Sequence, residues 1–410
     1  MSAGYDVVIV GAGHGGAQAA IALRQAQFTG TIAMIGAEPE LPYERPPLSK
    51  EFLCGDKAFE RMLIRPATFW HEQRIQVLSG RSVVAIDPAG RRVTLGDGER
   101  IGYSRLIWAA GGSPRRLTCA GANLAGVHTV RARADVERIR GELSDVTRVV
   151  VIGGGFIGLE TAATLRKLGK HVTVLEAQDR VLARVAAEPL SRFYETEHRS
   201  RGVDVQLNAR IERLEGVEGR VSGVRLADGT VLPAQMVIVG IGISPTVEAL
   251  VQAGAQVSNG VAIDSNCRTS LPDVFALGDC ALQESAFADG ARIRIESVQN
   301  ALDHAAVIAR HLSGGPAANT GVPWFWSNQY DLRLQTIGLA IGHDDLVLRG
   351  EPASRRFSLV YLKAGRVIAL DCINAAADYM QGRALVAARA CINRAKLADP
   401  AVPLKALAAS

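Results

Sequence analysis

The sequence contains no Cys-x-x-Cys pair, although it has six cysteines. They are scattered along the chain, and the two closest, Cys267 and Cys280, are 13 positions apart. A redox-active dithiol needs closely spaced cysteines, and iron–sulfur clusters and structural zinc sites need groups of them. The scatter therefore argues against a thiol-based redox centre, and we expect no metal site.

Long apolar runs and runs of one charge are also missing. No uninterrupted apolar run approaches the roughly 18 residues that span a bilayer, and the strand expected at residues 6–10 leaves no room for a signal peptide before it. The formal net charge is only +5, and no Lys/Arg-rich run indicates a nucleic-acid-binding surface. We expect a cytoplasmic enzyme that binds neither membrane nor nucleic acid.

Glycine, in contrast, is abundant, and two glycine-rich runs share one pattern. Residues 7–18 read VVIVGAGHGGAQ and residues 149–160 read VVVIGGGFIGLE. Each is an apolar strand, a Gly-x-Gly-x-x-Gly turn and the start of a helix, which is typical of dinucleotide binding. The helix N-terminus offers N–H groups to a pyrophosphate. The glycines are Gly11, Gly13 and Gly16 in the first copy and Gly153, Gly155 and Gly158 in the second.

The rest of the chain fits layers of helices and sheets. Strand and helix patterns alternate over residues 1–110 and again after residue 148, whereas residues 323–410 alternate like an antiparallel sheet and end in an Ala-rich helical stretch. No low-complexity linker separates these regions. At 410 residues the chain is long enough for two or three domains. We predict an α/β protein with two Rossmann-like dinucleotide-binding domains and a C-terminal α+β domain.

In each copy of the glycine-rich pattern, the residue that ends the second strand indicates which nucleotide binds there. In the second copy it is Glu176, where an acid can hydrogen-bond both hydroxyls of an adenosine ribose. A 2′-phosphate would meet a carboxylate there, which favours NADH over NADPH, although Arg180 and Arg184 nearby could soften that preference. In the first copy the equivalent position is Gly36, and the nearest acid is Glu38. The residue that holds the first ribose therefore stays open.

Several further motifs resemble one family. RPPLSK (45–50), WAAGG (108–112), TSLPDVFALGDC (269–280), RIESVQNA (294–301) and PWFWSNQYDLRLQTIG (323–338) resemble the FAD-dependent pyridine nucleotide-disulfide oxidoreductases. More narrowly, they are similar to the putidaredoxin-type ferredoxin reductases of bacterial cytochrome P450 and aromatic-ring dioxygenase systems. The resemblance runs from about residue 5 to about residue 405. One departure is Ala110 in AAGG, where the family has threonine.

The resemblance implies a glutathione-reductase-like architecture and assigns the two cofactors. FAD would bind a discontinuous domain of residues 1–113 and 247–322, NADH would bind residues 114–246, and residues 323–410 would form the C-terminal domain. The implied FAD contacts are Gly11, Gly13, Gly16, Glu38, Pro46, Lys50, Val84, Ala110, Gly111, Arg131, Asp279, Val298 and Trp326. The implied NADH contacts are Gly153, Gly155, Ile157, Gly158, Glu176, Arg184 and Gly242.

Two residues carry the implied chemistry. In the family a lysine at the position of Lys50 approaches flavin N5, and a glutamate at the position of Glu160 lies beside the nicotinamide and pairs with that lysine. Glu160 also has a plainer explanation, as an acid in the first turn of a helix, where the helix dipole favours it. Asp279 has one too, as a helix N-cap. Trp324 and Trp326 are either ordinary core aromatics or, for Trp326, a contact near the flavin.

The implied activity is transfer of a hydride from NADH to FAD and of single electrons to a [2Fe–2S] ferredoxin. Residues 323–410 hold 11 Lys and Arg against 7 Asp and Glu, a basic excess that suits an acidic ferredoxin. Candidate contacts are Arg65, Arg333, Lys396 and Lys405. We expect a monomer or weak homodimer. The alternatives are a rubredoxin reductase, an NADH oxidase-type flavoprotein, or an interaction protein resembling apoptosis-inducing factor.

Overall fold

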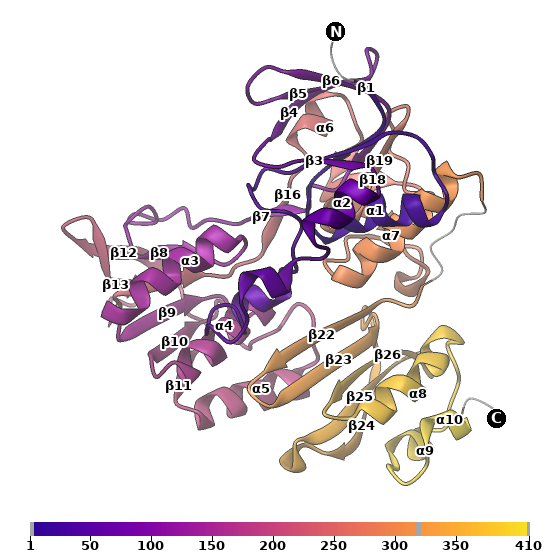
Figure 1. Cartoon of the computed structure of the whole chain (residues 1–410). Helices are drawn as coiled ribbons and strands as arrows, with labels where there is room; N and C mark the ends of the chain where they lie inside the picture. Colours follow the sequence, from indigo (N-terminus) through magenta and orange to yellow (C-terminus); the bar gives the residue numbers. More distant parts are fainter. Residues whose placement is uncertain (1–3, 316–320, 408–410) are drawn as a thin grey trace. The chain divides into compact units, whose positions relative to one another are not determined.

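A computed structural model describes residues 4–315 and 321–407 (Figure 1). The chain folds into two compact units, each assembled from three segments of the sequence. Unit 1 comprises Met1–Arg45, Phe59–Ser113 and Ser244–Phe325. Unit 2 comprises Pro46–Ala58, Pro114–Ile243 and Trp326–Ser410. Within the described ranges, no helix combines the length and the hydropathy needed to cross a membrane.

Unit 1 contains a seven-stranded sheet with the order β3-β2-β1-β6-β5-β4, in which β19 also pairs with β6. The pairs β1–β2, β1–β6, β2–β3 and β6–β19 are parallel, and β4–β5 and β5–β6 are antiparallel. The strands are β1 (Gly4–Val10), β2 (Ile32–Ile35), β3 (Ile75–Leu78), β4 (Val83–Asp87), β5 (Arg92–Leu95), β6 (Arg100–Trp108) and β19 (Val274–Ala276).

The apolar run of β1 contributes to a core on each face of the sheet, because successive side chains of a strand point to opposite faces. Val7 and Ile9 join a core with helices α1 (His14–Gln25) and α7 (Val298–Leu312). Val8 and Val10 join a second core with β5, β6 and the short helix α6 (Glu248–Gln252). Unit 1 also holds α2 (Ala67–Glu72) and a four-stranded sheet of β17 (Val257–Ser258), β18 (Gly260–Ile263), β20 (Ala281–Glu284) and β21 (Arg292–Ile293).

Unit 2 contains a parallel five-stranded sheet with the order β11-β10-β9-β15-β8. Its strands are β8 (Val127–Thr129), β9 (Arg148–Ile152), β10 (His171–Leu175), β11 (Val203–Gln206) and β15 (Met236–Val239). The accompanying helices are α3 (Arg133–Glu142), α4 (Phe156–Lys167) and α5 (Glu188–Ser200). An antiparallel sheet of β12 (Ile211–Val217), β13 (Arg220–Leu226) and β14 (Val231–Pro233) lies in the same segment. Two short strands, β7 (Gly112–Pro114) and β16 (Ile243–Pro245), pair where the chain passes between the units.

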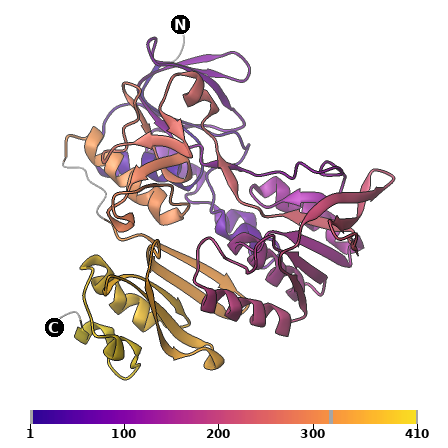
Figure 2. The ribbon, with the colours of Figure 1, turned by 180° about the vertical axis from the view of Figure 1, so that it is seen from behind.

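The C-terminal part of unit 2 is a five-stranded sheet with the order β22-β23-β26-β25-β24. Its strands are β22 (Trp324–Gln329), β23 (Leu332–Gly338), β24 (Asp345–Glu351), β25 (Arg356–Lys363) and β26 (Arg366–Ile373). Helix α8 (Ala376–Ala387) packs on β23 and β26, and α9 (Arg394–Ala398) and α10 (Leu404–Leu407) follow. The sheet lies beside α5 (Figure 2), where the rings of Phe193 and Phe357 are 4.9 Å apart.

The predicted fold class is confirmed. Both glycine-rich runs form strand–turn–helix units, and the alternating C-terminal pattern forms the antiparallel sheet followed by α8. The division into FAD, NADH and C-terminal domains, with boundaries after residues 113, 246 and 322, stays a prediction because it depends on which ligand each part binds.

Candidate active site

The first glycine turn joins β1 to α1, and close packing against the protein requires two of its three glycines. Gly11 has φ +109°, and a Cβ there would lie 2.3 Å from the Ala109 carbonyl oxygen. A Cβ on Gly16 would lie 1.8 Å from the Gly11 oxygen. A Cβ on Gly13 would instead enter open space, where the nearest atom is Nε of Arg45 at 3.8 Å. The turn is closed by protein at Gly11 and Gly16 and open at Gly13, its second glycine, as a pyrophosphate cradle requires.

Arg45 lies beside this turn and was not predicted as a site residue. Its guanidinium pairs with the Glu38 carboxylate at 2.6 Å, and the Tyr43 hydroxyl donates to the other Glu38 oxygen. Burial lowers the pKa of Arg45, but Glu38, Tyr43 and Asp279 outweigh burial and raise it overall. Arg45 is therefore a fixed cation at the open side of the first turn. The only sign in the sequence that Arg45 belongs to the site is its position as the first residue of RPPLSK.

The structure explains why Gly36 takes the position of the expected ribose acid. A Cβ on Gly36 would lie 2.7 Å from the Cβ of Ala12, so any side chain would displace the glycine turn. The nearest acid, Glu38, is held by Tyr43 and Arg45. Gly36 therefore reflects close packing at the end of β2.

The other predicted FAD contacts in unit 1 occupy loops and element ends. Ala110 and Gly111 follow β6, and Ala110 N would lie 2.9 Å from a Cβ on Gly11. Val298 begins α7, whose N-cap Ser297 accepts a hydrogen bond from the Asn300 N–H. The other two are Val84, half exposed on β4, and Asp279, inside the 3-10 turn Gly278–Cys280. Asp279 is thus not a helix N-cap residue, which removes that alternative.

The second glycine turn, between β9 and α4, repeats the steric pattern. Gly153 has φ +109°, and its Cβ would lie 2.4 Å from the Gly240 oxygen. A Cβ on Gly158 would lie 2.1 Å from the Gly153 oxygen, whereas nothing lies within 4 Å of a Cβ on Gly155. Ile157, the second residue of α4, is 48% exposed beside this opening.

Glu176 closes the second turn from the end of β10. One of its carboxylate oxygens accepts the Gly154 N–H at 2.7 Å, and the other accepts the Gln178 N–H at 2.9 Å. The acid is therefore fixed next to the opening at Gly155, where a ribose of the bound nucleotide is expected.

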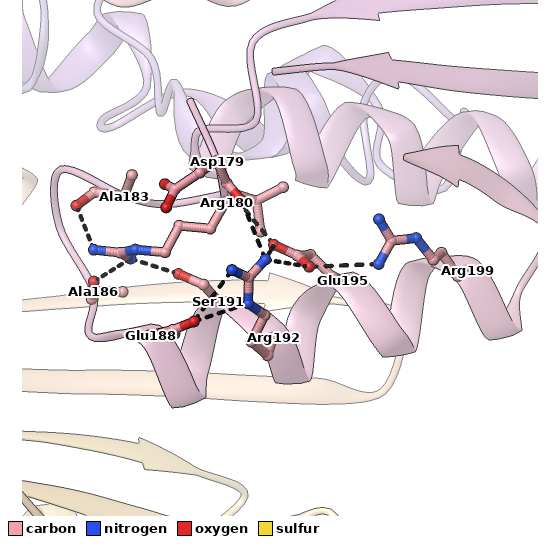
Figure 3. A network of polar contacts seen from close by, with 10 residues as sticks. Asp179, Arg180, Ala183, Ala186, Glu188, Ser191, Arg192, Glu195 and Arg199 are labelled. Carbon is pink, nitrogen blue, oxygen red and sulfur yellow. Dashed lines mark hydrogen bonds and ion pairs between the residues drawn. The ribbon is translucent and has the colours of Figure 1, made fainter. Parts of the chain in front are cut away.

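The loop after Glu176 holds two arginines, Arg180 and Arg184, whose side chains have different surroundings. Figure 3 shows the contacts of Arg180. The Arg180 guanidinium donates to the carbonyls of Ala183 and Ala186 and to the Ser191 hydroxyl. Arg180 therefore shapes the loop and is not available to a nucleotide phosphate, contrary to the expectation from sequence. The Arg184 side chain is exposed, and its guanidinium lies 3.5 Å from where a Cβ on Gly242 would be.

Unit 2 also brings Lys50 and Glu160 together. The 3-10 turn Pro46–Ser49 directly precedes Lys50, whose Nζ is 2.7 Å from Oε2 of Glu160. The Ser49 hydroxyl donates to the same oxygen at 2.7 Å, and the Ser327 hydroxyl donates to Oε1 at 2.7 Å. Glu160 is only 5% exposed. It is a buried carboxylate with three donors, two of which share one oxygen.

This geometry corrects the predicted place of Glu160. It is the fifth residue of α4 and lies beyond the first turn, which contains no acid. The helix dipole acts mainly within the first turn, so it does not account for a buried acid here. The Lys50 partner does, since buried charges are stable only when paired and hydrogen-bonded.

Sequence reasoning found Lys50 and Glu160 but missed their supporting residues. Ser49 and Ser327 donate to the carboxylate, and the Thr164 hydroxyl donates to the Ser49 carbonyl at 2.8 Å. Nothing in the sequence links residue 327 to residue 160. Of the other predicted FAD contacts in unit 2, Pro46 begins the 3-10 turn, Arg131 lies between β8 and α3, and Trp326 is half-buried on β22.

Comparisons with known proteins identify the class of protein. The sequence matches the family described as pyridine nucleotide-disulphide oxidoreductase over residues 5–305, and the reductase C-terminal family over residues 324–408. The chain belongs to the pyridine nucleotide-disulphide oxidoreductase family. The family uses FAD and NAD(P)H, and this chain is an FAD-dependent oxidoreductase. The two glycine turns, each open at its second glycine, fit two dinucleotides.

Within that class, several of its relatives are ferredoxin reductases. The chain is 58% identical over 402 residues to a ferredoxin–NAD(P)+ reductase from Sphingomonas sp., covering 98% of this chain and 97% of that protein. It is 55% identical over 407 residues to the ferredoxin reductase subunit of a 5,5'-dehydrodivanillate O-demethylase from Sphingobium sp., covering 99% of each. A solved complex of putidaredoxin reductase with putidaredoxin matches with a TM-score of 0.95 and 40% identity, over 100% of this chain and 99% of that chain.

Proposed function

We propose that the protein is an NADH-dependent ferredoxin reductase that serves a cytochrome P450 or a ring-hydroxylating dioxygenase. The observation that carries the proposal is the buried Lys50–Glu160 pair in a chain with two dinucleotide cradles. All six cysteines are free in the structure, and none of them lies close to another in the sequence as a redox-active dithiol does. Bound FAD would supply two-electron acceptance of a hydride from NADH and release of single electrons, which an acceptor with a [2Fe–2S] centre can take.

Lys50 and Glu160 would act on the hydride donor and the flavin by position and charge. The side chain of Lys50 is 13% exposed and that of Glu160 is 6% exposed, so solvent screens their pairing little. Glu160 holds the Lys50 ammonium at one oxygen. In this role Lys50 would hold a fixed positive charge beside the bound flavin and Glu160 would orient the nicotinamide, which would supply the near-attack geometry that hydride transfer needs.

We expect Glu176 to select NADH. The parent protein should use NADH with a kcat/KM at least roughly tenfold above that for NADPH, equivalent to about 1.4 kcal/mol. Glu176→Ala should shrink this preference chiefly by weakening NADH, because it removes the acceptor both for the ribose and for the Gly154 N–H. Glu176→Gln keeps an acceptor oxygen without the charge, so it should admit NADPH while losing less NADH activity. Equal use of both nucleotides by the parent protein would contradict the assignment.

The acceptor would dock through exposed basic residues that each unit presents by itself. Arg333 on β23, Lys396 on α9 and Lys405 on α10 are exposed. None of the three forms an ion pair with another residue of the described chain, in contrast to Arg394, which pairs with Asp345. Arg65 in unit 1 is exposed with its guanidinium over the Phe69 ring. Unpaired exposed cations attract an acidic partner most strongly, because no neighbouring carboxylate offsets them.

Salt should therefore slow electron transfer to a protein acceptor selectively. With an acidic [2Fe–2S] ferredoxin, kcat/KM should fall as ionic strength rises, because exposed charges are screened within about 8–10 Å at 0.1–0.15 M salt. Reduction of a small uncharged quinone should hardly change, since no protein surface has to be matched. Arg333→Glu and Lys405→Glu should raise the KM for ferredoxin several-fold and flatten its salt dependence.

The matched control is Arg394→Gln, which removes an exposed cation that is already paired. It should leave the ferredoxin KM within about twofold, as exposed pairs contribute little. If ferredoxin and quinone show the same salt profile, the basic excess is only a solvated surface and a small-molecule acceptor becomes the better assignment. We further propose a cytoplasmic location. We also propose that the protein is a monomer or weak homodimer, and analytical ultracentrifugation at micromolar concentration tests this oligomeric state.

A further inference from the structure

A continuous chain of buried side chains leads away from Glu160 into the C-terminal sheet. Ser327 and Gln329 are alternate residues of β22, so both point to the same face, whereas Asn328 between them is exposed. Gln329 Nε2 is 3.3 Å from Ser327 Oγ, and Gln329 Oε1 is 2.8 Å from Nε2 of His198 on α5. The Tyr330 hydroxyl is 3.1 Å from Nδ1 of His198. Ser327, Gln329 and His198 are each at most 1% exposed.

The hydrogen bonds of this chain all run in one direction. Ser327 donates to Glu160, so its oxygen accepts from the amide nitrogen of Gln329. The amide oxygen of Gln329 then needs the proton on Nε2 of His198, which leaves Nδ1 to accept from the Tyr330 hydroxyl. Burial lowers the pKa of His198 to about 4, so the ring is neutral and has one donor and one acceptor. Every donor therefore points toward the Glu160 carboxylate.

Tyr330, at the outer end of the hydrogen-bond chain, is fixed by contacts of its own backbone and ring. Tyr330 has φ +56°, a left-handed conformation that a bulky residue adopts only where its surroundings enforce it. The Arg201 guanidinium lies 4.4 Å from the centre of the Tyr330 ring, and the same arginine bonds Asp331. The tyrosine is thus fixed from the ring face, with its hydroxyl directed at His198. A hydrogen-bond chain that is anchored at Tyr330 in this way can hold the Ser327 side chain rigidly.

The two oxygens of Glu160 are served by different parts of unit 2. Lys50 and Ser49 contact Oε2, whereas Ser327 is the donor to Oε1. A carboxylate held at one oxygen can still rotate about its last side-chain bond, because that torsion is broad. Ser327 at the second oxygen removes this freedom and fixes the carboxylate plane. Hydrogen bonds in series also polarise one another, which strengthens the last bond to the charged group.

We propose that Ser327 and Gln329 are positioning residues, which orient the Glu160 carboxylate through a hydrogen-bond chain anchored at His198 and Tyr330. This inference rests on the proposed role of the Lys50–Glu160 pair. It assigns to β22, a strand of the C-terminal sheet, a part in hydride transfer from NADH.

The kinetic test compares two buried serines of the same sheet. Ser327→Ala should lower the limiting rate of FAD reduction by NADH about tenfold in stopped flow, with the NADH dissociation constant unchanged within about twofold. Gln329→Met should lower the rate about threefold. Ser327→Thr keeps the hydroxyl and should restore the rate. The control is Ser358→Ala on β25, since Ser358 is also fully buried and donates to a carboxylate, that of Asp378 at 2.9 Å.

A second readout does not depend on turnover. In the holoenzyme labelled with 15N-histidine, His198 should show the Nε2–H tautomer by NMR. Glu160→Gln should shift its nitrogen resonances although Glu160 and His198 share no direct contact, and this shift should vanish when Ser327→Ala is added. A merely structural serine would leave the response of His198 to Glu160→Gln in place.

The outcomes separate the two claims. Two results would overturn the inference and leave the proposed function standing. One is slow FAD reduction in Glu160→Gln together with a normal rate in Ser327→Ala. The other is equal slowing in Ser327→Ala and Ser358→Ala. A normal rate in Glu160→Gln would remove the proposed role of the pair and the inference with it, even if the NMR coupling persisted.

Discussion

Glu160→Gln should slow the reduction of bound FAD by NADH about 100-fold and leave the FAD content unchanged. Misplacing a group that positions the reactants can cost this much, and glutamine cannot hold the Lys50 ammonium as a carboxylate does. The substitution keeps the shape of the side chain among Ser49, Lys50 and Ser327, so packing is preserved. Stopped-flow absorbance of the flavin measures the rate, and the visible spectrum measures FAD content.

The stability of the variants distinguishes chemistry from packing. Glu160→Gln leaves Lys50 as an uncompensated buried charge, which costs about 3–5 kcal/mol of unfolding free energy. The double variant Glu160→Gln, Lys50→Met removes that charge, so it should recover most of the stability and none of the rate.

Asp378→Asn is the matched control for this experiment. Asp378 pairs with the buried Arg349 on the C-terminal sheet, at 3.0 Å. Its loss should destabilise the protein without slowing flavin reduction. If Glu160→Gln reduces FAD at the parent rate, Glu160 has only a structural role.

Valine at the open glycines should separate the two cofactors. Gly13 and Gly155 both have extended backbone conformations that valine accepts, and both precede a helix. Gly155→Val should raise the KM for NADH about 100-fold with FAD content unchanged, because the side chain fills the space that the pyrophosphate needs. Gly13→Val should instead yield protein with little FAD. FAD content by absorbance and NADH affinity by steady-state kinetics measure the two effects.

Gly141→Val on α3 controls for the added side chain, since a Cβ there also meets nothing within 4 Å. It should leave both cofactors unaffected. The thermal unfolding of Gly155→Val should stay near that of the parent, because a Cβ there meets no protein atom within 4 Å. Loss of FAD in Gly155→Val, or unchanged NADH affinity, would contradict the assignment of the second turn.

The sequence by itself determined the fold class and the two cradles. A strand–turn–helix unit is local in sequence, and its glycines are required by contacts within the unit, as the Gly158 position against the Gly153 oxygen shows. Glu176 could be found for the same reason, since it directly follows β10, the next strand after the same strand–turn–helix unit. Lys50 and Glu160 were found through motifs that resemble a known family.

The tertiary structure alone decided how those residues are supported. Ser49 and Ser327 meet at Glu160 from segments that lie far apart in the chain, and no local pattern records that meeting. Arg180 and Arg184 look alike in sequence. The Arg180 guanidinium is hydrogen-bonded to carbonyls of its own loop, whereas the Arg184 side chain is exposed. The burial of Glu160 beyond the first turn of its helix likewise depends on a cation from another segment. Long-range hydrogen bonds depend on how distant segments pack, and local sequence patterns do not encode that packing.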